Sequence, residues 1–250
     1  MIFDVIARRA ALTPQRKAVW FNGRWYSYSE LDRRAERLAA GLAARGVVKG
    51  DRVSILALNH LAHLDLIAAT AKLGFVYAPL NYRLPAREGA QIVRYLKPRL
   101  LLYDESNAEV ALALQRALGV ETLPLARYEG WLEASSGAFA DPELNEEDSQ
   151  MILLTGGSTG LPKGAMQPYR QGFYNAVNTV FSWGLRDDDC VVQATPAFHA
   201  AVNALTVPLL HLGGRVVLTL SFEPGAYLEL VREHRCTLLF MVPTMYKRLA

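Results

Sequence analysis

The order of apolar and polar residues predicts that the chain opens with a β-hairpin followed by a long helix. Two apolar runs, Lys17–Phe21 and Arg24–Ser27, flank Asn22-Gly23, a dipeptide typical of type I′ turns. After Ser27, apolar residues recur at helical spacing over several turns. Ser27 and Glu30 have the spacing of a capping box, which favours a helix start at this point.

From residue 53 onward, short apolar runs alternate with helical patterns, which is typical of parallel βαβ units. Strands are predicted at 53–58, 75–80, 100–103, 151–154, 190–194, 215–220 and 237–242. Helices are predicted at 60–73, 85–97, 107–118, 169–183, 202–211, 224–235 and from Pro243 onward. Asn59 and Asn107 are placed to cap the helices that follow them. The predicted fold class is therefore α/β, with mostly parallel sheets flanked by helices.

Composition narrows the class of protein without identifying a partner. Of the 250 residues, 51% are hydrophobic, which is enough for a packed core and excludes general disorder. The net charge is +3, and no dense run of Lys and Arg gives a footprint for nucleic acid. The N-terminus has no long apolar segment, and no uncharged run is long enough to span a membrane. We expect a cytoplasmic protein, and contact with a membrane surface is left open.

Other polar groups have a structural interpretation. Cys190 and Cys236 lie far apart without metal-ligand spacing, so both are expected to be reduced core residues. His60 and His63 lie three residues apart with Asp65 close by, but no Glu-x-x-His or Cys partner accompanies them, so both are expected at a solvated helix start. Asp187-Asp188-Asp189 is expected to be a polar turn, because a cation cage needs ligands at alternating positions. Residues 129–147 mix Gly, Ser, Pro and acidic residues, which predicts a surface excursion.

The stretch with the clearest chemistry runs from Thr155 to Gly164 and follows the predicted strand 151–154. Its glycines let backbone N–H groups approach an anion, its hydroxyl side chains add donors, and Lys163 adds a positive charge. A phosphate-binding loop is predicted, with an ordinary mobile loop as the alternative. A Walker A loop is not expected, because Pro162 and Gly164 on either side of the lysine would interrupt the helix that it requires.

The run Thr-Gly-Gly-Ser-Thr-Gly-Leu-Pro-Lys-Gly at 155–164 closely resembles the signature of the AMP-forming acyl-CoA synthetases, within the adenylate-forming superfamily. Gly156 departs from the family pattern, where serine or threonine is commoner. Thr195-Pro196-Ala197-Phe198-His199 resembles a Pro-x-Phe-His segment of the family, and Val242-Pro243-Thr244 resembles its Val-Pro-Thr. The likeness extends from about Ser27 to the last residue.

The resemblance implies a reaction in which MgATP activates a carboxylic acid to an acyl-adenylate, and the acyl group then passes to CoA. It also implies which residues form the site, although the metal ligands stay unknown. The β- and γ-phosphates would be held by Thr155, Gly156, Gly157, Ser158, Thr159 and Gly160, with Lys163 supplying charge. His199 would border the acyl group as the candidate catalytic residue, whereas by itself a histidine beside phenylalanine is more typical of packing or a helix cap.

The resemblance further implies two similar sheet subdomains, one from residues 52–180 and the other from 1–50 together with 190–250. The segments that bind adenine and ribose, and a C-terminal domain with a catalytic lysine, would lie beyond residue 250. The chain is therefore expected to be a partial AMP-binding domain of an acid–CoA ligase, with its C-terminal domain absent. The isolated 250-residue chain is expected to be inactive or nearly so.

Two alternative functions stay open on the sequence. One is a relative with another acceptor, such as a peptide-synthetase adenylation domain or a luciferase-like oxygenase. The other is a non-catalytic fragment that binds nucleotide or a partner subunit. A fatty acid is the default substrate, because His199 has small apolar neighbours, and aromatic acids are also open. The oligomeric state is not predicted.

Overall fold

The computed structural model describes residues 3–155 and 162–249. The chain divides into two compact units. The first comprises Met1–Arg33, Asn59–Ala62 and Arg170–Ala250, and the second comprises Arg34–Leu58 and His63–Tyr169. Each unit contains one sheet with helices against it, so the predicted α/β fold class is confirmed. The subdomain bounds implied by the resemblance stay a prediction for the intact domain.

The second unit is built on a six-stranded sheet with the order β6-β5-β3-β4-β7-β8. Its neighbours pair in parallel except β7 and β8, which pair antiparallel. The strands are β3 (Arg52–Leu56), β4 (Val76–Pro79), β5 (Leu100–Tyr103), β6 (Glu121–Pro124), β7 (Ser149–Thr155) and β8 (Lys163–Pro168). The helices are α2 (Tyr28–Ala44), α3 (Leu61–Leu73), α4 (Ala86–Leu96), α5 (Ala108–Leu118) and α6 (Tyr128–Ala134). Short 3₁₀ turns precede α5 and α6.

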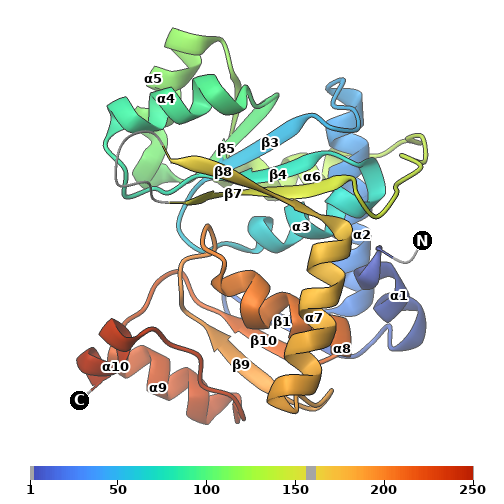
Figure 1. Ribbon diagram of the computed structural model, residues 1–250, viewed down its shortest axis with the longest axis vertical. Coiled ribbons are helices and arrows are strands. Elements are labelled where there is room, and N and C mark those ends of the chain that lie inside the picture. The colour runs from blue at the N-terminus through green and yellow to red at the C-terminus, as the bar shows by residue number, and fades with distance from the viewer. Residues whose placement is uncertain (1–2, 156–161, 250) are drawn as a thin grey trace. The chain divides into compact units, whose positions relative to one another are not determined.

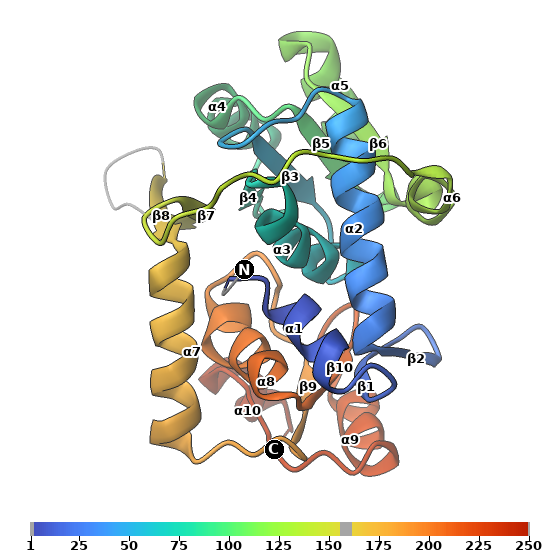
Figure 2. The same cartoon turned by 90° about the vertical axis from the view of Figure 1, so that its right-hand side faces the viewer.

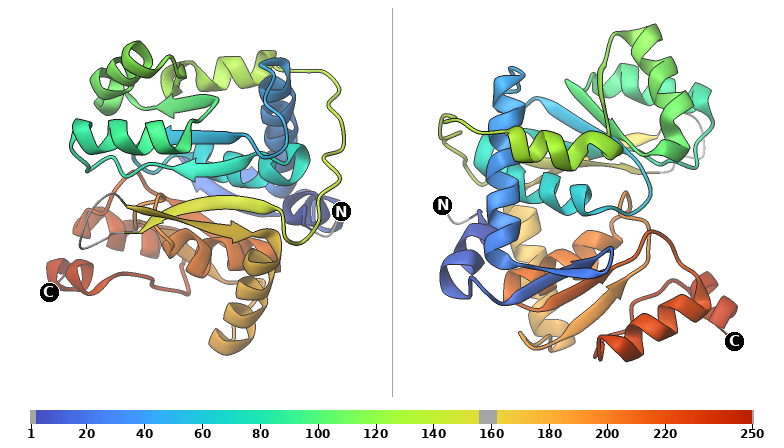
Figure 3. Two further views of the ribbon diagram at one scale, coloured as in Figure 1. Left: turned by 45° about the horizontal axis from the view of Figure 1, so that its top comes forward. Right: turned by 180° about the vertical axis from the view of Figure 1, so that it is seen from behind.

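Helices cover both faces of this sheet. On one face, buried Leu56, Ala78 and Leu101 pack with the apolar sides of α4 and α5. On the other face, Tyr77 of β4 meets α3, where its hydroxyl is 2.6 Å from His63 Nδ1. Figure 2 shows the strands between α4 and α5 on one side and α3 on the other, and the right panel of Figure 3 shows α2, α3 and α6 together. Burial on both faces explains why these strands are almost continuously apolar.

A buried ion pair joins α2 to α3, and a second, more exposed pair joins α2 to α6. Arg34 on α2 donates to both carboxylate oxygens of Asp65 on α3, at 2.7–3.2 Å, and to Glu129 on α6. The hydroxyl of Tyr128 donates to Asp65 at 3.0 Å. Burial opposes the charge of Arg34, but the Asp65 carboxylate raises the pKa of the guanidinium further above its usual range. The charges are therefore paired and hydrogen-bonded inside the unit.

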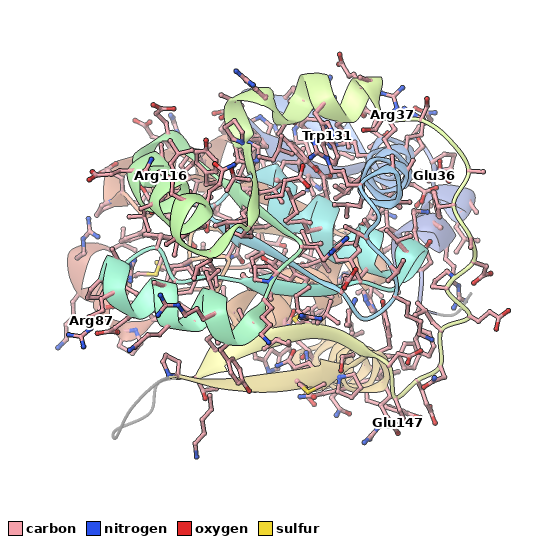
Figure 4. All side chains as sticks on the ribbon, turned by 90° about the horizontal axis from the view of Figure 1, so that it is seen from above. Glu36, Arg37, Arg87, Arg116, Trp131 and Glu147 are labelled. Carbon is pink, nitrogen blue, oxygen red and sulfur yellow. The ribbon has the colours of Figure 1, made fainter. Side chains whose placement is uncertain are left out.

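Close packing of α2 against α6 depends on a glycine. A Cβ at Gly41 would lie 2.6 Å from the Trp131 ring and 2.4 Å from Ser135 Oγ. Figure 4 labels Trp131 beside α6 and α2. The indole can pack against the α2 backbone only because position 41 has no side chain.

The first unit is built on a four-stranded sheet with the order β2-β1-β10-β9. Its strands are β1 (Lys17–Phe21), β2 (Arg24–Ser27), β9 (Cys190–Gln193) and β10 (Arg215–Leu218). Its helices are α1 (Val5–Leu12), α7 (Tyr169–Trp183), α8 (Val207–Leu212), α9 (Pro224–Glu233) and α10 (Pro243–Leu249), with a π-helical turn, η3 (Val202–Thr206), before α8. Figure 1 shows α9 and α10 on one side of β9 and α8 on the other. Val192, Val217 and Tyr227 lie in the core on the α9 side.

Most predicted elements are confirmed, and the capping box is formed. Glu30 accepts from Ser27 N at 2.7 Å, and Ser27 Oγ accepts from Glu30 N at 3.2 Å. Asn107 occupies the predicted N-cap position of α5, but its side chain makes no capping bond and its amide donates to Asp104 instead. The strand predicted at 237–242 is wrong within the described residues, since Leu238 makes only an isolated bridge to Val191. After this bridge the described chain makes no further strand pairing with β9, and α10 begins at Pro243.

Several elements had no prediction from the sequence. They are α1, β6, α6 and β8. The helix α6 occupies the start of the expected surface excursion, so only its later part, after Ala134, lacks helix and strand up to β7. The helix predicted from Val202 begins as the π-helical turn η3 instead of an α-helical one. Pro208 lies just after this turn and has no N–H to continue a regular hydrogen-bond ladder.

Candidate functional site

The predicted phosphate loop joins β7 to β8 in the second unit. Thr155 ends β7 and Lys163 begins β8, and these two residues are register partners in the antiparallel pair. Thr155 Oγ1 donates to the Lys163 carbonyl at 3.2 Å. Partners directly opposite in a sheet project from the same face, so the hydroxyl and the ammonium leave β7 and β8 together. Both residues are exposed.

The remaining residues predicted to contact phosphate are Gly156, Gly157, Ser158, Thr159 and Gly160. These five lie outside the described residues, so their roles stay predictions. The structure extends β7 to Thr155 and places Lys163 in a strand, whereas the sequence predicted a loop over the whole stretch. Lys163 is exposed at the first position of β8.

Gly164 explains how β8 fits beside β7. A Cβ at this position would lie 2.9 Å from Ile152 Cγ2, a contact that real Cβ atoms essentially never make. Ile152 packs against the cluster formed by α4 and α5. The glycine therefore lets β8 approach β7 directly after the lysine, and a larger residue would push the strand that carries Lys163 away from Thr155.

The second candidate segment follows β9 in the first unit. Thr195, Ala197 and Phe198 are buried, and His199 is exposed at the end of the segment. The Phe198 and His199 rings lie 4.1 Å apart with an interplanar angle of 45°. His199 N donates to the Pro196 carbonyl at 3.1 Å, which closes a turn. The segment thus lies at the carboxyl end of a parallel strand, an edge where ligands collect in α/β sheets.

Asn59 has a role that the sequence did not predict. Its side chain does not cap α3. It hydrogen-bonds the backbone of the segment that leads to His199 and the end of β10. In its place, Ala62 N donates to Nδ1 of His60 at 3.1 Å. The Asn59 partners lie more than 130 residues away in sequence, so no local pattern could have indicated them.

The histidine and aspartate motifs form structural contacts. His63 was expected at a solvated helix start, but it is buried between the Tyr77 hydroxyl and the Leu58 carbonyl. In the acidic turn, Asp189 accepts from Arg186 N at 2.7 Å and from Thr237 Oγ1 at 2.6 Å. Among the described residues, no group of three His, Cys, Asp or Glu side chains is placed to hold a metal ion.

A separate groove of about 320 Å³ lies in the first unit between α1, α7 and α8. Its wall is mostly apolar, and it also carries Arg8, Arg9 and His211. Arg9 is partly engaged, because its Nε donates to the His211 carbonyl at 2.7 Å. His199 does not line this groove, so the groove is not part of the candidate site.

Comparison with known proteins decides the family. The family model described as AMP-binding enzyme matches residues 6–250. The chain belongs to this family. A feruloyl-CoA synthase from Amycolatopsis sp. is 39% identical over 246 residues, covering 97% of this chain and 49% of the relative. The resemblance inferred from residues 155–164 is therefore confirmed.

Two solved structures extend the comparison to the fold. The ATP-bound form of MatB from Rhodopseudomonas palustris is similar with a TM-score of 0.88 and 30% identity, covering 99% of this chain and 50% of that one. The o-succinylbenzoate CoA synthetase of Bacillus subtilis, in complex with its acyl-adenylate intermediate, gives 0.87 and 26%, covering 98% and 63%. The fold matches the N-terminal part of acyl-CoA synthetases. The chain spans about half the length of the curated relatives it matches.

Within the described ranges, no helix combines the length and the apolar character needed to cross a membrane.

Proposed function

We propose that this chain is the nucleotide-phosphate-binding part of an AMP-forming acid–CoA ligase. The observation that carries the proposal is the run 155–164 within a family match over residues 6–250. In the proposed reaction, a carboxylate oxygen of the acid bonds to the α-phosphorus of ATP, and pyrophosphate leaves with the electron pair of the broken bond. The thiol of CoA then attacks the acyl carbon and displaces AMP. The ATP-bound and acyl-adenylate-bound neighbours support this chemistry.

The proposed role of the segment between β7 and β8 is electrostatic. The first step brings two anions together, so donors and positive charge near the phosphates lower its barrier. We assign the Thr155 hydroxyl, the Ser158 and Thr159 hydroxyls and the backbone of Gly156, Gly157 and Gly160 to the β- and γ-phosphates. Lys163 supplies the positive charge. The exposed pairing of Thr155 with Lys163 on one face supports this assignment, because one ligand could meet both groups.

The fit of the implied Mg²⁺ and CoA to the described residues is limited. These residues contain no three-ligand group for a metal, so we assign magnesium no protein ligand among them and expect it to enter with the phosphates. The chemistry it supplies is neutralisation of phosphate charge. We assign CoA no contact in these residues either. His199 is proposed to border the acyl group, which its exposure at the end of β9 permits.

The test of this function uses the protein translated from its full reading frame. ATP–pyrophosphate exchange is measured with a panel of carboxylic acids. Lys163→Ala is expected to lower the exchange rate by about 100-fold, because the positive charge that stabilises the leaving pyrophosphate is lost. Lys17→Ala, which removes an exposed lysine from β1, is the matched control and should retain activity. Exchange that is unaffected by Lys163→Ala would contradict the assignment.

The same assay tests which acid is used. Fatty acids are the class expected from the small apolar neighbours of His199, and palmitate serves as their probe. Aromatic acids are the second class, supported by 39% identity to a feruloyl-CoA synthase, and ferulate serves as their probe. The class with the higher kcat/KM is the substrate class. A following assay for thioester formation with CoA tests the acceptor, and exchange without thioester would favour another acceptor.

The isolated 250-residue chain is proposed to bind nucleotide without catalysing the reaction. Ligand that binds only the folded state raises its melting temperature. We expect ATP and AMP to raise this temperature, and we expect no pyrophosphate exchange above background. Exchange by this chain alone, lost in Lys163→Ala, would contradict the proposal that it is inactive.

A further inference from the structure

The side chain of Asn59 connects the carboxyl ends of two neighbouring parallel strands. Its Nδ2 donates to the Thr195 carbonyl at 3.1 Å, just after β9, and to the Thr219 carbonyl at 3.0 Å, just after β10. Its Oδ1 accepts from Ala197 N at 2.7 Å. Asn59 is 2% exposed, so these bonds take the place of water for its own amide group.

A second amide holds the same segment from the strand side. Gln193 Nε2 donates to the carbonyl and the hydroxyl of Thr195, at 2.7 and 2.6 Å. The Thr206 hydroxyl donates to Gln193 Oε1 in a short bond of 2.5 Å. All three residues are buried. The backbone from Thr195 to Ala197 is therefore held by two side-chain amides, which fixes its path better than a solvated loop.

The fixed segment ends at His199. Ala197, whose N–H is bound by Asn59, is followed by buried Phe198, and the His199 ring lies against the Phe198 ring. A shift of Ala197 would move both rings, because the turn between Pro196 and His199 is closed by a backbone hydrogen bond. The position of the exposed His199 imidazole thus depends on Asn59, 140 residues earlier in the chain.

We propose that Asn59 is a positioning residue for His199. It sets the place of the imidazole at the strand ends, and through it the shape of the acyl-binding surface. This inference rests on the proposed function, in which His199 borders the acyl group. Asn59 itself touches neither acid nor nucleotide in this proposal.

The experiment measures ATP–pyrophosphate exchange on the full reading frame, with the acid and ATP varied separately. The variants are Asn59→Ala, which removes all three bonds, and Asn59→Asp, which keeps the acceptor and loses both donors. Each is expected to raise the KM for the acid about 10-fold or more, with the KM for ATP unchanged, because misplacement affects the acyl side alone. Thr206→Val removes only the support of Gln193 and should raise the same KM by a smaller factor.

Two comparisons separate positioning from a loss of stability. Asn107→Ala, a buried asparagine of the second unit, is the matched control; it should lower the melting temperature without raising the KM for the acid. In the background of His199→Ala, Asn59→Ala should cause no further rise, because the residue through which it acts is gone. If Asn59→Ala does not fold, Thr206→Val in both backgrounds gives the same comparison.

The possible results distinguish the two proposals. A KM rise of equal size with and without His199 would overturn the positioning role, as would a fall in melting temperature alone. Both results leave the proposed function standing, since the parent protein is active in them. A parent protein that exchanges pyrophosphate with no acid of the panel would overturn the proposed function, and the positioning role with it.

Discussion

At the scale of a single residue, Gly164 sets how closely β8 can approach β7 beside the candidate phosphate-binding segment. A methyl group at this position would lie 2.9 Å from Ile152 Cγ2, a branch that cannot swing away as the end of a long side chain can. We predict that Gly164→Ala lowers the free energy of unfolding by about 1–3 kcal/mol, through overpacking between β7 and β8. Urea denaturation measures this.

Two variants test that explanation. Ile152→Ala in the Gly164→Ala background removes the colliding branch. The double variant should therefore lose less stability than the sum of the losses in the two single variants. Gly89→Ala on α4 is the control, because a Cβ there has nothing within 4 Å, and it should be neutral or stabilising. A neutral Gly164→Ala would show that β8 adjusts without cost.

Among the helices, the ion pair between α2 and α3 makes a second prediction. The Asp65 side chain is fully buried and that of Arg34 is 12% exposed. In Arg34→Met, the buried Asp65 carboxylate loses its cation and, within this cluster, keeps only the hydrogen bond that the Tyr128 hydroxyl donates. We expect a loss of about 3–5 kcal/mol in the free energy of unfolding. Arg33→Met, an exposed neighbour, should change it by less than about 0.5 kcal/mol. Equal effects would contradict the importance of the pair.

A cysteine pair links β9 to the chain after α9. Cys190 and Cys236 are free thiols with sulfur atoms 3.5 Å apart, although their sequence positions suggested no partnership. The hydrogen bond with Cys236 lowers the pKa of Cys190, and Arg215 acts in the same direction while burial opposes it. We predict that hydrogen peroxide joins them in one intrachain disulfide, with two thiols oxidised and peroxide reduced to two waters. Mass spectrometry should show about 2 Da lost.

The control for this prediction is Cys236→Ser, which should form no intrachain disulfide under the same treatment. A disulfide that closes a loop of this length should also raise the melting temperature. Dimer formation in place of the intrachain bond would contradict the predicted geometry.

These elements also show what sequence reasoning can reach. The buried strands were predictable because burial on both faces makes runs such as 100–103 continuously apolar, and glycines or prolines punctuate them. Strand β8 was not, because Lys163–Pro168 has little strand propensity and pairs only since β7 offers a partner. The phosphate motif was readable as a local run of residues. Asn59 was not, because its partners become neighbours only in the folded unit.

Stability of the whole molecule should depend on pH through His211. Burial, with help from the charge of Arg9, lowers the pKa of His211 from 6.5 to about 4. Below about pH 6.5 His211 is protonated in the unfolded chain but stays neutral in the folded protein. Its contribution to the free energy of unfolding is therefore fully present above that pH and is lost as the pH falls toward 4. From this residue we expect a loss of about 2 kcal/mol between roughly pH 7.5 and 5. The lowered pKa of His234, also due to burial, acts in the same direction.

Urea denaturation of the parent and of His211→Leu at the two pH values measures this contribution. The variant should lose less stability on acidification than the parent does. If the parent and His211→Leu lose the same stability between the two pH values, the lowered pKa of His211 would be contradicted.

The path of the chain between the two units affects where related genes can recombine and still encode a folded protein. The chain passes from one unit to the other after Arg33, Leu58, Ala62 and Tyr169, so neither unit is encoded by one uninterrupted stretch. A single recombination junction placed between Arg33 and Tyr169 would divide both units at once, so the core of each unit would combine residues from two parent proteins. Chimeras between relatives should therefore tolerate crossovers beyond Tyr169 better than crossovers among the earlier switch points.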